Sequence, residues 1–331
     1  MKAMADGGIL VAGAGAIGSV VGGMLHAAGH RVTMLGRCEH LDAIARDGLR
    51  ITGLLGEHLV RGLDLVDDPA RLPGRFPLIL LTVKSYDTAE IADAISNRLA
   101  DDGIVVSLQN GLGNIETLAE RFSLARVLGG RVIFGAEIVR PGAAHVTVFA
   151  DPVAIGPDPQ QHRELSAGLE RRAKSIAAML DASGVPTVAV ADVMPVIWTK
   201  LLYNAALNPL GALYELSYGE LANDRDLVAI MNDVIDEAFA VASRTGVRLP
   251  FADASAYREL FYGRLIPATA SHRPTMLFDL KNRGRTDIDS LNGKIVELGE
   301  RVGIDTPANR MLTRLIHGAE RRREKNPAME K

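Results

Sequence analysis

The sequence predicts a doubly wound α/β domain with a parallel sheet, followed by an all-α domain. The glycine-rich segment Gly13-Ala14-Gly15-Ala16-Ile17-Gly18 lies directly between an apolar run, Ile9–Ala12, and a helical pattern. Short apolar runs alternate with helical periodicity over the first half of the chain, which is typical of a parallel sheet. From Asp192 onward the periodicity is mainly helical. We therefore expect an α/β domain over residues 1–191 and a helical domain over residues 192–331.

The glycine-rich segment has the spacing of a dinucleotide-binding loop in a Rossmann-like domain. Such a loop is a strong signal when it follows a strand and opens a helix, and Arg31–Leu35 supplies the next strand of a βαβ unit. Gly13 permits the tight turn, Gly15 lets a pyrophosphate approach the backbone, and Gly18 allows close helix–strand packing. The helix N-terminus then faces the anion. The alternative interpretation is a structural glycine turn in another kind of α/β protein.

The end of this second strand selects the dinucleotide. An NAD site usually has Asp or Glu there, which accepts hydrogen bonds from the ribose hydroxyls. In this chain the strand runs into Gly36 and Arg37, with no acid at that position. A guanidinium can bind a 2′-phosphate through paired donors, so we predict NADP(H) as the cofactor. The alternative is that Arg37 is a solvated surface charge.

Two later strands of the first domain end in polar side chains. Leu78–Val83 ends at Lys84, and Gly103–Leu108 ends at Gln109-Asn110-Gly111. Ligands of open α/β sheets bind beyond the carboxyl ends of the strands, so we expect Lys84 and Asn110 near the dinucleotide or its substrate. The alternative interpretation of Lys84 is a solvated charge in a loop. For Asn110, which precedes a glycine, the alternative is a turn residue. The domain is completed by a strand pair over 48–60, a hairpin over 131–150 that 153–156 extends, a helix over 165–180 and a strand over 187–191.

The most informative stretch of the second domain carries Lys200, Asn204 and Asn208. On a helix, one ammonium and two carboxamides at i, i+4 and i+8 lie along one stripe, about 6 Å apart along the axis. The residues between them are almost all apolar, and burying polar groups is costly without partners, so we predict a site. The alternative for Lys200 is a lysine that snorkels from a helix edge. Pro209 removes a helical hydrogen bond, so we expect the helix to bend or end there.

Composition excludes several classes of protein. The chain has 331 residues and a net charge of −3, which gives no footprint for nucleic acid or an anionic membrane. One cysteine, Cys38, cannot form an internal disulfide, and no membrane span or signal sequence is recognised, so we expect a cytoplasmic protein. His and Cys show no metal-ligand spacing, so no metal is predicted. Apolar helical surfaces over 192–320 are compatible with a homodimer.

Taken together, these motifs resemble the ketopantoate reductases (2-dehydropantoate 2-reductases) over nearly the whole chain. The resemblance rests on five segments: Gly13–Gly18, Thr82–Lys84, Gln109–Gly113, Lys200–Leu210 and Thr286–Gly293. It implies a Rossmann-like domain and a helical domain, with the active site in the cleft between them. It also implies NADPH-dependent reduction of a 2-keto acid to a 2-hydroxy acid, ketopantoate to pantoate, on the route to pantothenate and coenzyme A.

The resemblance assigns roles to individual residues. Lys200 matches the family's proton donor, and Asn204 and Asn208 match its substrate-binding asparagines. The other matches concern the cofactor and its junction with the substrate: Arg37 for the 2′-phosphate, Lys84 and Asn110 for the junction, and Ala136 for a cofactor contact.

The chain departs from the family pattern near its C-terminal part. The usual Thr-Glu-Ile-Asp motif reads Thr286-Asp287-Ile288-Asp289, and the substrate-binding serine appears as Thr275. Tyr218 stands where one type of member has a substrate-side asparagine. We expect Asp287 to orient Lys200 or to hold a ribose or substrate hydroxyl, or else to be an acid at a helix N-terminus. These departures leave the exact keto acid open.

The chemistry of ketone reduction agrees with this assignment. Hydride addition to a ketone carbon builds negative charge on oxygen, which an ammonium stabilises while it delivers the proton. Lysine has a reference pKa of about 10.4, so it starts protonated. The alternatives are a paralogous NADPH-dependent reductase of another 2-keto acid, a β-hydroxyacid dehydrogenase, which shares the Lys-x-x-x-Asn helix, and a non-catalytic NADP(H)-sensing protein. A sensor needs no proton donor beside the nicotinamide, so the Lys200 stripe disfavours it.

Overall fold

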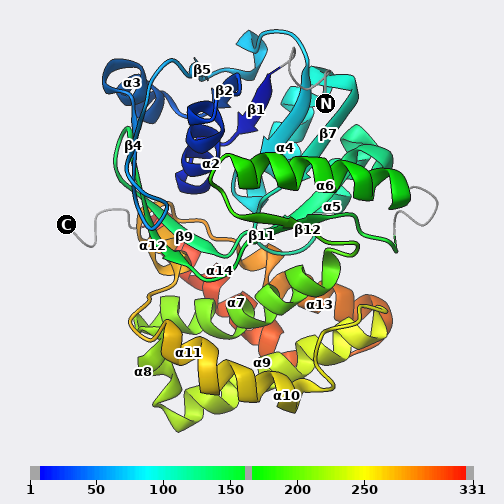
Figure 1. The fold of residues 1–331 in the computed structure, drawn as a ribbon. Coiled ribbons are helices and arrows are strands. Elements are labelled where there is room, and N and C mark those ends of the chain that lie inside the picture. The colour runs from blue at the N-terminus through cyan, green and yellow to red at the C-terminus, as the bar shows by residue number, and fades with distance from the viewer. Residues whose placement is uncertain (1–7, 161–165, 326–331) are drawn as a thin grey trace. The chain divides into compact units, whose positions relative to one another are not determined.

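The computed structural model of the chain describes residues 8–160 and 166–325 (Figure 1). The chain divides into two compact units. The first runs to Gln109 and then from Asn114 to Met194, and the second holds Asn110–Gly113 and the residues from Pro195 onward. The domain boundary expected after residue 191 stays a prediction. The short segment that carries Asn110, assigned by sequence to the first domain, groups with the second unit.

The first unit contains an eight-stranded sheet in the order β12-β11-β8-β7-β6-β1-β2-β5. β1 (Ile9–Ala12) pairs in parallel with β2 (Val32–Leu35) and with β6 (Phe76–Leu81), and β6 pairs in parallel with β7 (Leu99–Ser107). Helices and a second sheet cover these strands, so they read as continuous apolar runs rather than as alternating patterns. The remaining strands are β5 (Asp64–Val66), β8 (Val127–Arg131), β11 (Val153–Gly156) and β12 (Thr187–Ala189).

The strand expected to extend the hairpin belongs instead to this large sheet. β11 pairs antiparallel with β8 and parallel with β12. Its four residues are all buried, as expected for a strand that has a neighbour on each side. The local sequence showed a strand here but not its partner.

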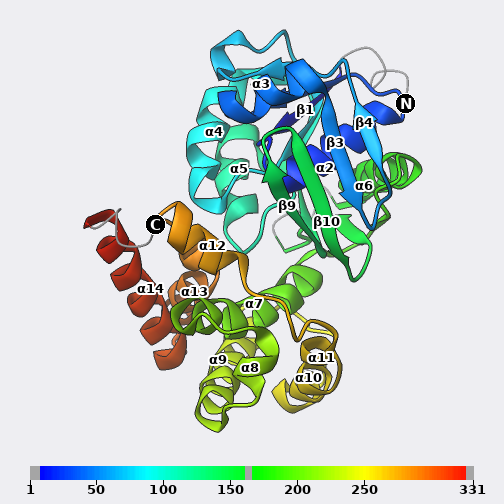
Figure 2. The ribbon, with the colours of Figure 1, turned by 90° about the vertical axis from the view of Figure 1, so that its left-hand side faces the viewer.

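A second sheet of four strands lies against α2 (Ala16–Ala27), as Figure 2 shows. α2 contacts β1 and β2 of the large sheet and all four strands of the second sheet, so it lies between the two sheets. A Cβ on Gly23 of α2 would lie 2.6 Å from Ile51 Cδ1, so glycine permits this close approach. The second sheet confirms the predicted strand pair and hairpin, with the order β4 (His58–Val60), β3 (Leu49–Gly53), β10 (Ala143–Phe149) and β9 (Phe134–Arg140).

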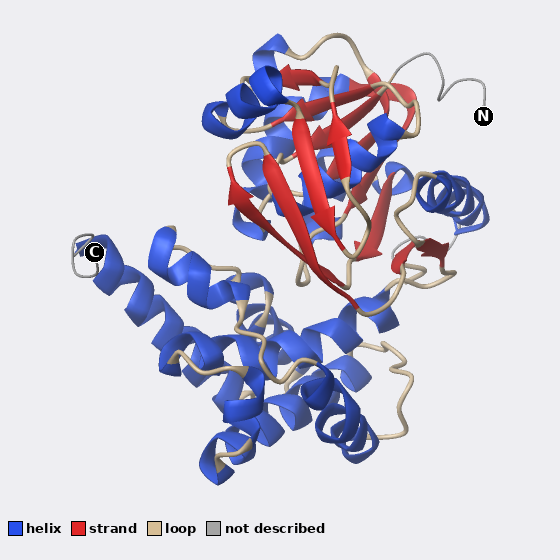
Figure 3. Ribbon diagram, turned by 60° about the vertical axis from the view of Figure 1, so that its left-hand side comes forward, coloured by secondary structure: helices blue, strands red, loops and turns tan. Residues whose placement is uncertain are grey.

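Four further helices complete the first unit. α5 (Asn114–Phe122) contacts β7, β8 and α4 (Thr88–Ile95), while α6 (Ser166–Ala182) contacts β11 and β12. α3 (Cys38–Asp47) follows β2 and contacts β3 and β5. Every strand among the described residues belongs to the first unit, as the colouring in Figure 3 makes clear.

The second unit is helical, as predicted. Its first helix, α7 (Met194–Tyr214), buries Trp198 and most of its leucines and alanines. Among the described residues, no helix combines the length and apolar character that a bilayer-spanning segment requires. The other helices are α8 (Tyr218–Ala222), α9 (Arg225–Arg244), α10 (Ala254–Leu260), α11 (Ile266–Ala268), α12 (Thr275–Asn282), α13 (Asn292–Val302) and α14 (Pro307–Lys325), with a 3₁₀ turn, η6 (Ile288–Ser290), before α13.

His40 of α3 connects three elements of the first unit. Its Nδ1 accepts a hydrogen bond from the Gly142 N–H at 3.2 Å, in the turn between β9 and β10. Its Nε2 lies 3.0 Å from Ser19 Oγ on α2. Because Nδ1 accepts, the neutral ring carries its proton on Nε2 and donates it to Ser19. Burial lowers the pKa of His40, which favours this neutral form in the folded state.

We predict that His40 makes the protein less stable at mildly acidic pH. Its folded pKa is below its unfolded pKa of about 6.5, so the stabilisation is full above about pH 6.5 and is lost as the pH falls below that value. His40→Gln retains an acceptor for Gly142 but does not titrate. Thermal unfolding at about pH 7.5 and 5.5 should therefore show a smaller decline of Tm in this variant than in the wild type. With His30→Gln as the control outside this network, an equal decline in all three proteins would contradict the prediction.

Candidate functional site

The glycine-rich loop joins β1 to α2 at the carboxyl edge of the large sheet. Gly13 has φ +118°, and a Cβ on it would lie 2.6 Å from the Val83 N. A Cβ on Gly18 would lie 1.9 Å from Gly13 O. Real Cβ atoms do not come so close, so packing within the protein itself requires glycine at both positions.

Gly15 differs from these two glycines. Its backbone is extended, with φ −79° and ψ −166°, and a Cβ on it would meet no atom within 4 Å. Gly15 is the N-cap of α2 and offers no side chain to the first N–H groups of that helix. The missing side chain leaves these N–H groups open to an anion, which fits the pyrophosphate of a dinucleotide.

The end of β2 carries Arg37 and, unexpectedly, a neighbouring carboxylate. Arg37 is exposed at the start of α3, and its guanidinium bonds to no other described residue. Asp67, which follows β5, accepts a hydrogen bond from Cys38 Sγ at 3.3 Å and pairs with Arg71 at 2.7 Å. The Cys38 hydrogen bond lowers the pKa of Asp67, so this carboxylate is ionised. The pairing of β5 with β2 places Asp67 in this region, which local sequence patterns did not indicate.

A polar network joins the carboxyl ends of β6 and β7. Gln109 Nε2 donates to Val83 O at 3.0 Å and to Thr88 Oγ1 at 2.7 Å. Gln109 Oε1 accepts from Ser107 Oγ at 3.0 Å. The network therefore fixes the segment that carries the half-buried Lys84, directly after Val83. Gln109 belonged to a recognised motif, but its positioning role was not predicted.

Helix α7 carries the polar stripe and does not end at Pro209, since it continues to Tyr214. Lys200 Nζ donates to Asn110 Oδ1 at 2.5 Å, so the structure brings together two of the predicted site residues within the second unit. A carboxamide oxygen holds the ammonium without neutralising its charge.

The two asparagines of the stripe differ in their partners. Asn208 Oδ1 accepts a hydrogen bond from Tyr218 OH at 3.0 Å. This contact fixes the orientation of the amide, so its Nδ2 donors point away from Tyr218. Burial raises the pKa of Tyr218 well above its usual value, so its hydroxyl keeps the proton it donates. Asn204 is only 9% exposed, and its side chain bonds to none of the other described residues. Buried amides normally have partners, so Asn204 is a candidate for contact with a ligand.

The turn that carries Asn110 is packed on η6. Leu112 N donates to Ser290 O at 2.9 Å. Gly111 has φ +82°, and a Cβ on it would lie only 2.4 Å from Ser290 O, so glycine is required there. The half-buried Asp287 directly precedes η6. The segment over residues 287–290 therefore lies beside the turn that holds Lys200 through Asn110.

Two predicted residues lie on other elements. Thr275 is exposed at the first position of α12, after Pro274, whose ring lies close to Gly211 of α7. Ala136 is half-buried on β9, which contacts α2. The first unit thus holds the glycine loop, Arg37, Lys84 and Ala136, and the second holds Asn110, Lys200, Asn204, Asn208, Thr275 and Asp287.

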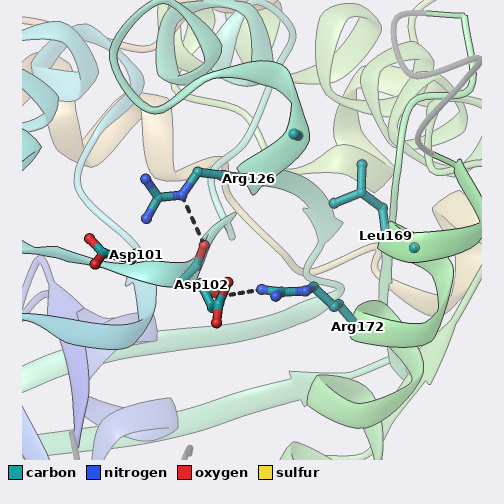
Figure 4. A pocket seen from close by; sticks show the side chains of 8 residues that line it. Asp101, Asp102, Arg126, Leu169 and Arg172 are labelled. Carbon is teal, nitrogen blue, oxygen red and sulfur yellow. Dashed lines mark hydrogen bonds between the residues drawn. The ribbon is translucent and has the colours of Figure 1, made fainter.

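A pocket of about 240 Å³ in the first unit contains none of the predicted residues (Figure 4). It lies at the start of β7, and β7 is parallel to β6 and thereby to β1, so it is at the edge opposite the glycine loop. Two arginines there donate to main-chain carbonyls: Arg126 to Gly103 O at 3.3 Å, and Arg172 to Asp102 O. Both arginines therefore bind the main chain of β7, and this structural role explains their position in the pocket.

The sheet with its glycine loop and the separate helical unit define a two-part, nicotinamide-dinucleotide-dependent reductase. Residues 9–160 match the family model described as ketopantoate reductase PanE/ApbA, and residues 192–320 match the model described as its C-terminal part. The chain belongs to the ketopantoate reductase family, so the predicted resemblance and fold class are confirmed.

Individual relatives agree with this membership. The 2-dehydropantoate 2-reductase of Aquifex aeolicus is 36% identical over 313 residues, which cover 94% of this chain and 96% of the relative. A PanE/ApbA family ketopantoate reductase from Ralstonia eutropha JMP134 has a TM-score of 0.83 at 34% identity, covering 96% and 99% of the two chains. A D-mandelate dehydrogenase solved with NADH has a TM-score of 0.80 at 26% identity, covering 95% and 99%.

We predict that Gly15→Ala weakens dinucleotide binding without destabilising the fold. The new Cβ meets no protein atom, so Tm should stay within about 2 °C of the wild type. It would occupy the approach to the N–H groups of α2, so the Kd for NADPH should rise about tenfold or more, about 1.4 kcal/mol. Fluorescence titration measures this Kd. Gly168→Ala, whose Cβ also meets no atom, is the matched control, and unchanged NADPH affinity in Gly15→Ala would contradict the prediction.

Proposed function

We propose that this protein reduces ketopantoate to pantoate with NADPH, as a step in pantothenate and coenzyme A biosynthesis. The observation that supports this most directly is the polar stripe on α7 of this chain, which belongs to the ketopantoate reductase family. In it, the nearly buried Asn204 amide, without a partner among the described residues, lies between Lys200 and Asn208. The cytoplasmic location and the homodimer expected from composition stay predictions.

NADPH is the cofactor that the residues at the end of β2 favour. Arg37 is exposed and has no competing ion pair among the described residues, so its guanidinium is available to a 2′-phosphate. When bound, the cofactor supplies the hydride. The residues proposed to hold it are Gly13, Ala14, Gly15, Ala16, Ile17, Gly18, Arg37, Lys84, Asn110, Ala136 and Asp287.

Lys200 is the proposed proton donor. Negative charge develops on the ketone oxygen as the carbonyl carbon is reduced, and an ammonium both stabilises that charge and delivers the proton. The hydrogen bond to Asn110 holds Nζ in place, and this neutral acceptor does not itself cancel the charge of the ammonium. Asn110 is thereby proposed to act at the junction of substrate and cofactor.

Asn204, Asn208 and Thr275 are proposed to bind the substrate. A 2-keto acid presents a carboxylate next to the ketone, and both groups accept hydrogen bonds. Tyr218 fixes the Asn208 amide so that its Nδ2 donors are the part offered to a ligand. Asn204 offers a second amide one helical turn away, and Thr275 offers a hydroxyl.

A paralogous reductase of another 2-keto acid is the second candidate. The structural likeness to a D-mandelate dehydrogenase, at a TM-score of 0.80, shows that this fold also serves a different 2-hydroxy acid. The carboxylate of Asp67 near the end of β2 also favours a test of NADH beside NADPH.

The proposal predicts that the purified protein oxidises NADPH most efficiently with ketopantoate. Steady-state absorbance with ketopantoate, other branched 2-keto acids and phenylglyoxylate, each with NADPH or NADH, measures this preference. The highest kcat/KM should belong to the pair of ketopantoate and NADPH. Turnover of only another keto acid would reject the ketopantoate role, and tight NADPH binding without turnover of any of them would favour a sensor.

We predict that Arg37→Ala weakens NADPH binding much more than NADH binding. A charged hydrogen bond to the 2′-phosphate contributes about 1.5–3 kcal/mol, so the KM for NADPH should rise about 10- to 100-fold. The KM for NADH is the internal control, because NADH lacks that phosphate. Parallel weakening of both cofactors would show that Arg37 does not recognise the 2′-phosphate.

A further inference from the structure

The main chain of α7 lacks one hydrogen bond within the polar stripe. Pro209 lies inside the helix, directly after Asn208. Proline has no N–H, so the carbonyl four residues earlier, Ala205 O, receives no hydrogen bond from position 209. Ala205 is fully buried, and a buried carbonyl without a donor is costly. The missing bond lies between Asn204 and Asn208, where the helix backbone determines the relative positions of these two side chains.

Asn292 supplies the missing donor. Its Nδ2 donates to Ala205 O at 3.0 Å and to Asn309 Oδ1 at 3.0 Å. Asn292 is 0% exposed and is the first residue of α13. Both partners accept hydrogen bonds, so the amide is fixed with its NH₂ group toward them, and a carboxylate at this position could not replace it.

A buried polar chain holds Asn292 in turn. Asn309 Nδ2 donates to Glu237 Oε2 at 2.7 Å. Glu237 also accepts the N–H groups of Ala308, at 2.7 Å, and Asn309, at 3.0 Å, in the first turn of α14. Groups from α9, α13 and α14 therefore converge on one carbonyl of α7.

The same segment also supports the other side of the site. Ser290, two residues before Asn292, accepts the Leu112 N–H in the turn that carries Asn110. Asn110 in turn accepts from Lys200 Nζ. One short stretch of chain thus supports both the partner of Lys200 and the helix backbone behind the two asparagines.

We propose that Asn292 is a positioning residue. Its side chain replaces the N–H missing at Pro209 and so fixes the backbone path of α7 between Lys200 and Asn208. It acts through the helix backbone. This inference rests on the proposed function, because the stripe it aligns is the proposed substrate site. Pro209 and Asn292 act together. The proline leaves Ala205 O without a donor from the helix, and the Asn292 side chain on α13 then binds this carbonyl and fixes α7 at Ala205.

The test is rescue by a second substitution. Asn292→Leu removes the donor at similar volume, so kcat should fall about 10- to 100-fold, as expected for a misplaced site, while the Kd for NADPH stays constant. Pro209→Ala in the same chain restores an N–H that can reach Ala205 O, so the double variant should regain most of the lost turnover. Pro209→Ala also removes the general cost of a proline inside a helix, so Tm is measured beside kcat, and a rescue that merely follows Tm would overturn the proposal. A double variant as slow as Asn292→Leu would overturn it as well.

Asp224→Ala is the matched control for stability. It removes the side-chain cap at the N-terminus of α9 but touches neither Asn292 nor the chain that holds it. Its Tm should fall while its kcat remains that of the wild type. An equal loss of kcat in Asp224→Ala and Asn292→Leu at similar Tm would attribute the effect to destabilisation and overturn the positioning role. If Asn292→Leu does not fold, Asn292→Ala takes its place with the same expected rescue.

Hydrogen–deuterium exchange separates this inference from the proposed function, because it needs no substrate. Asn292→Leu should speed exchange over residues 204–214 of α7, and Pro209→Ala should reverse that change. This pattern in a protein that reduces no 2-keto acid would reject the proposed function and support the structural role of Asn292. Unchanged exchange and kcat in Asn292→Leu, beside an active wild type, would overturn the role of Asn292 alone.

Discussion

The requirement that buried polar groups find partners governs the structure around α7. The Ala205 carbonyl, left without a donor by Pro209, is paired by a side chain from α13. Asn208 is paired by a buried tyrosine hydroxyl, and Lys200 by the carboxamide of Asn110. Asn204 alone on this stripe is nearly buried without a partner among the described residues. The protein therefore fixes the surroundings of the stripe and leaves the Asn204 amide and the Asn208 Nδ2 donors for a ligand.

The glycine loop of the first unit also leaves hydrogen-bond donors for a ligand. Gly13 and Gly18 are required by contacts within the protein, whereas Gly15 faces open space at the N-terminus of α2. The first N–H groups of that helix receive no side-chain cap, so they too are donors left for a ligand. Each unit leaves donors where an anionic or carbonyl ligand is expected: the first N–H groups of α2 in the first unit and the Asn204 amide in the second.

Local sequence patterns predicted the parts of this structure that local physics decides. Buried parallel strands read as apolar runs, and the glycine loop was recognisable because it joined such a run to a helix. Pairings between distant residues were not predictable. The local pattern assigns β11 to the hairpin, whereas this strand pairs with β8 of the large sheet. No local pattern indicates the position of Asp67 or the Asn292–Ala205 bond. The proline gap itself is visible in the sequence, but its donor lies 87 residues away, and no local pattern connects the two.

The most direct test of this account is the turnover of Lys200→Met with ketopantoate and NADPH. Methionine keeps a long apolar side chain on α7 and removes only the ammonium. The account predicts a fall in kcat of about 10²- to 10⁴-fold with the Kd for NADPH nearly unchanged, because the proton donor is lost and the cofactor loop is intact. Lys281→Met, which removes a half-buried lysine paired with Glu215 in the same unit, should retain wild-type kcat. Wild-type turnover in Lys200→Met would contradict the account.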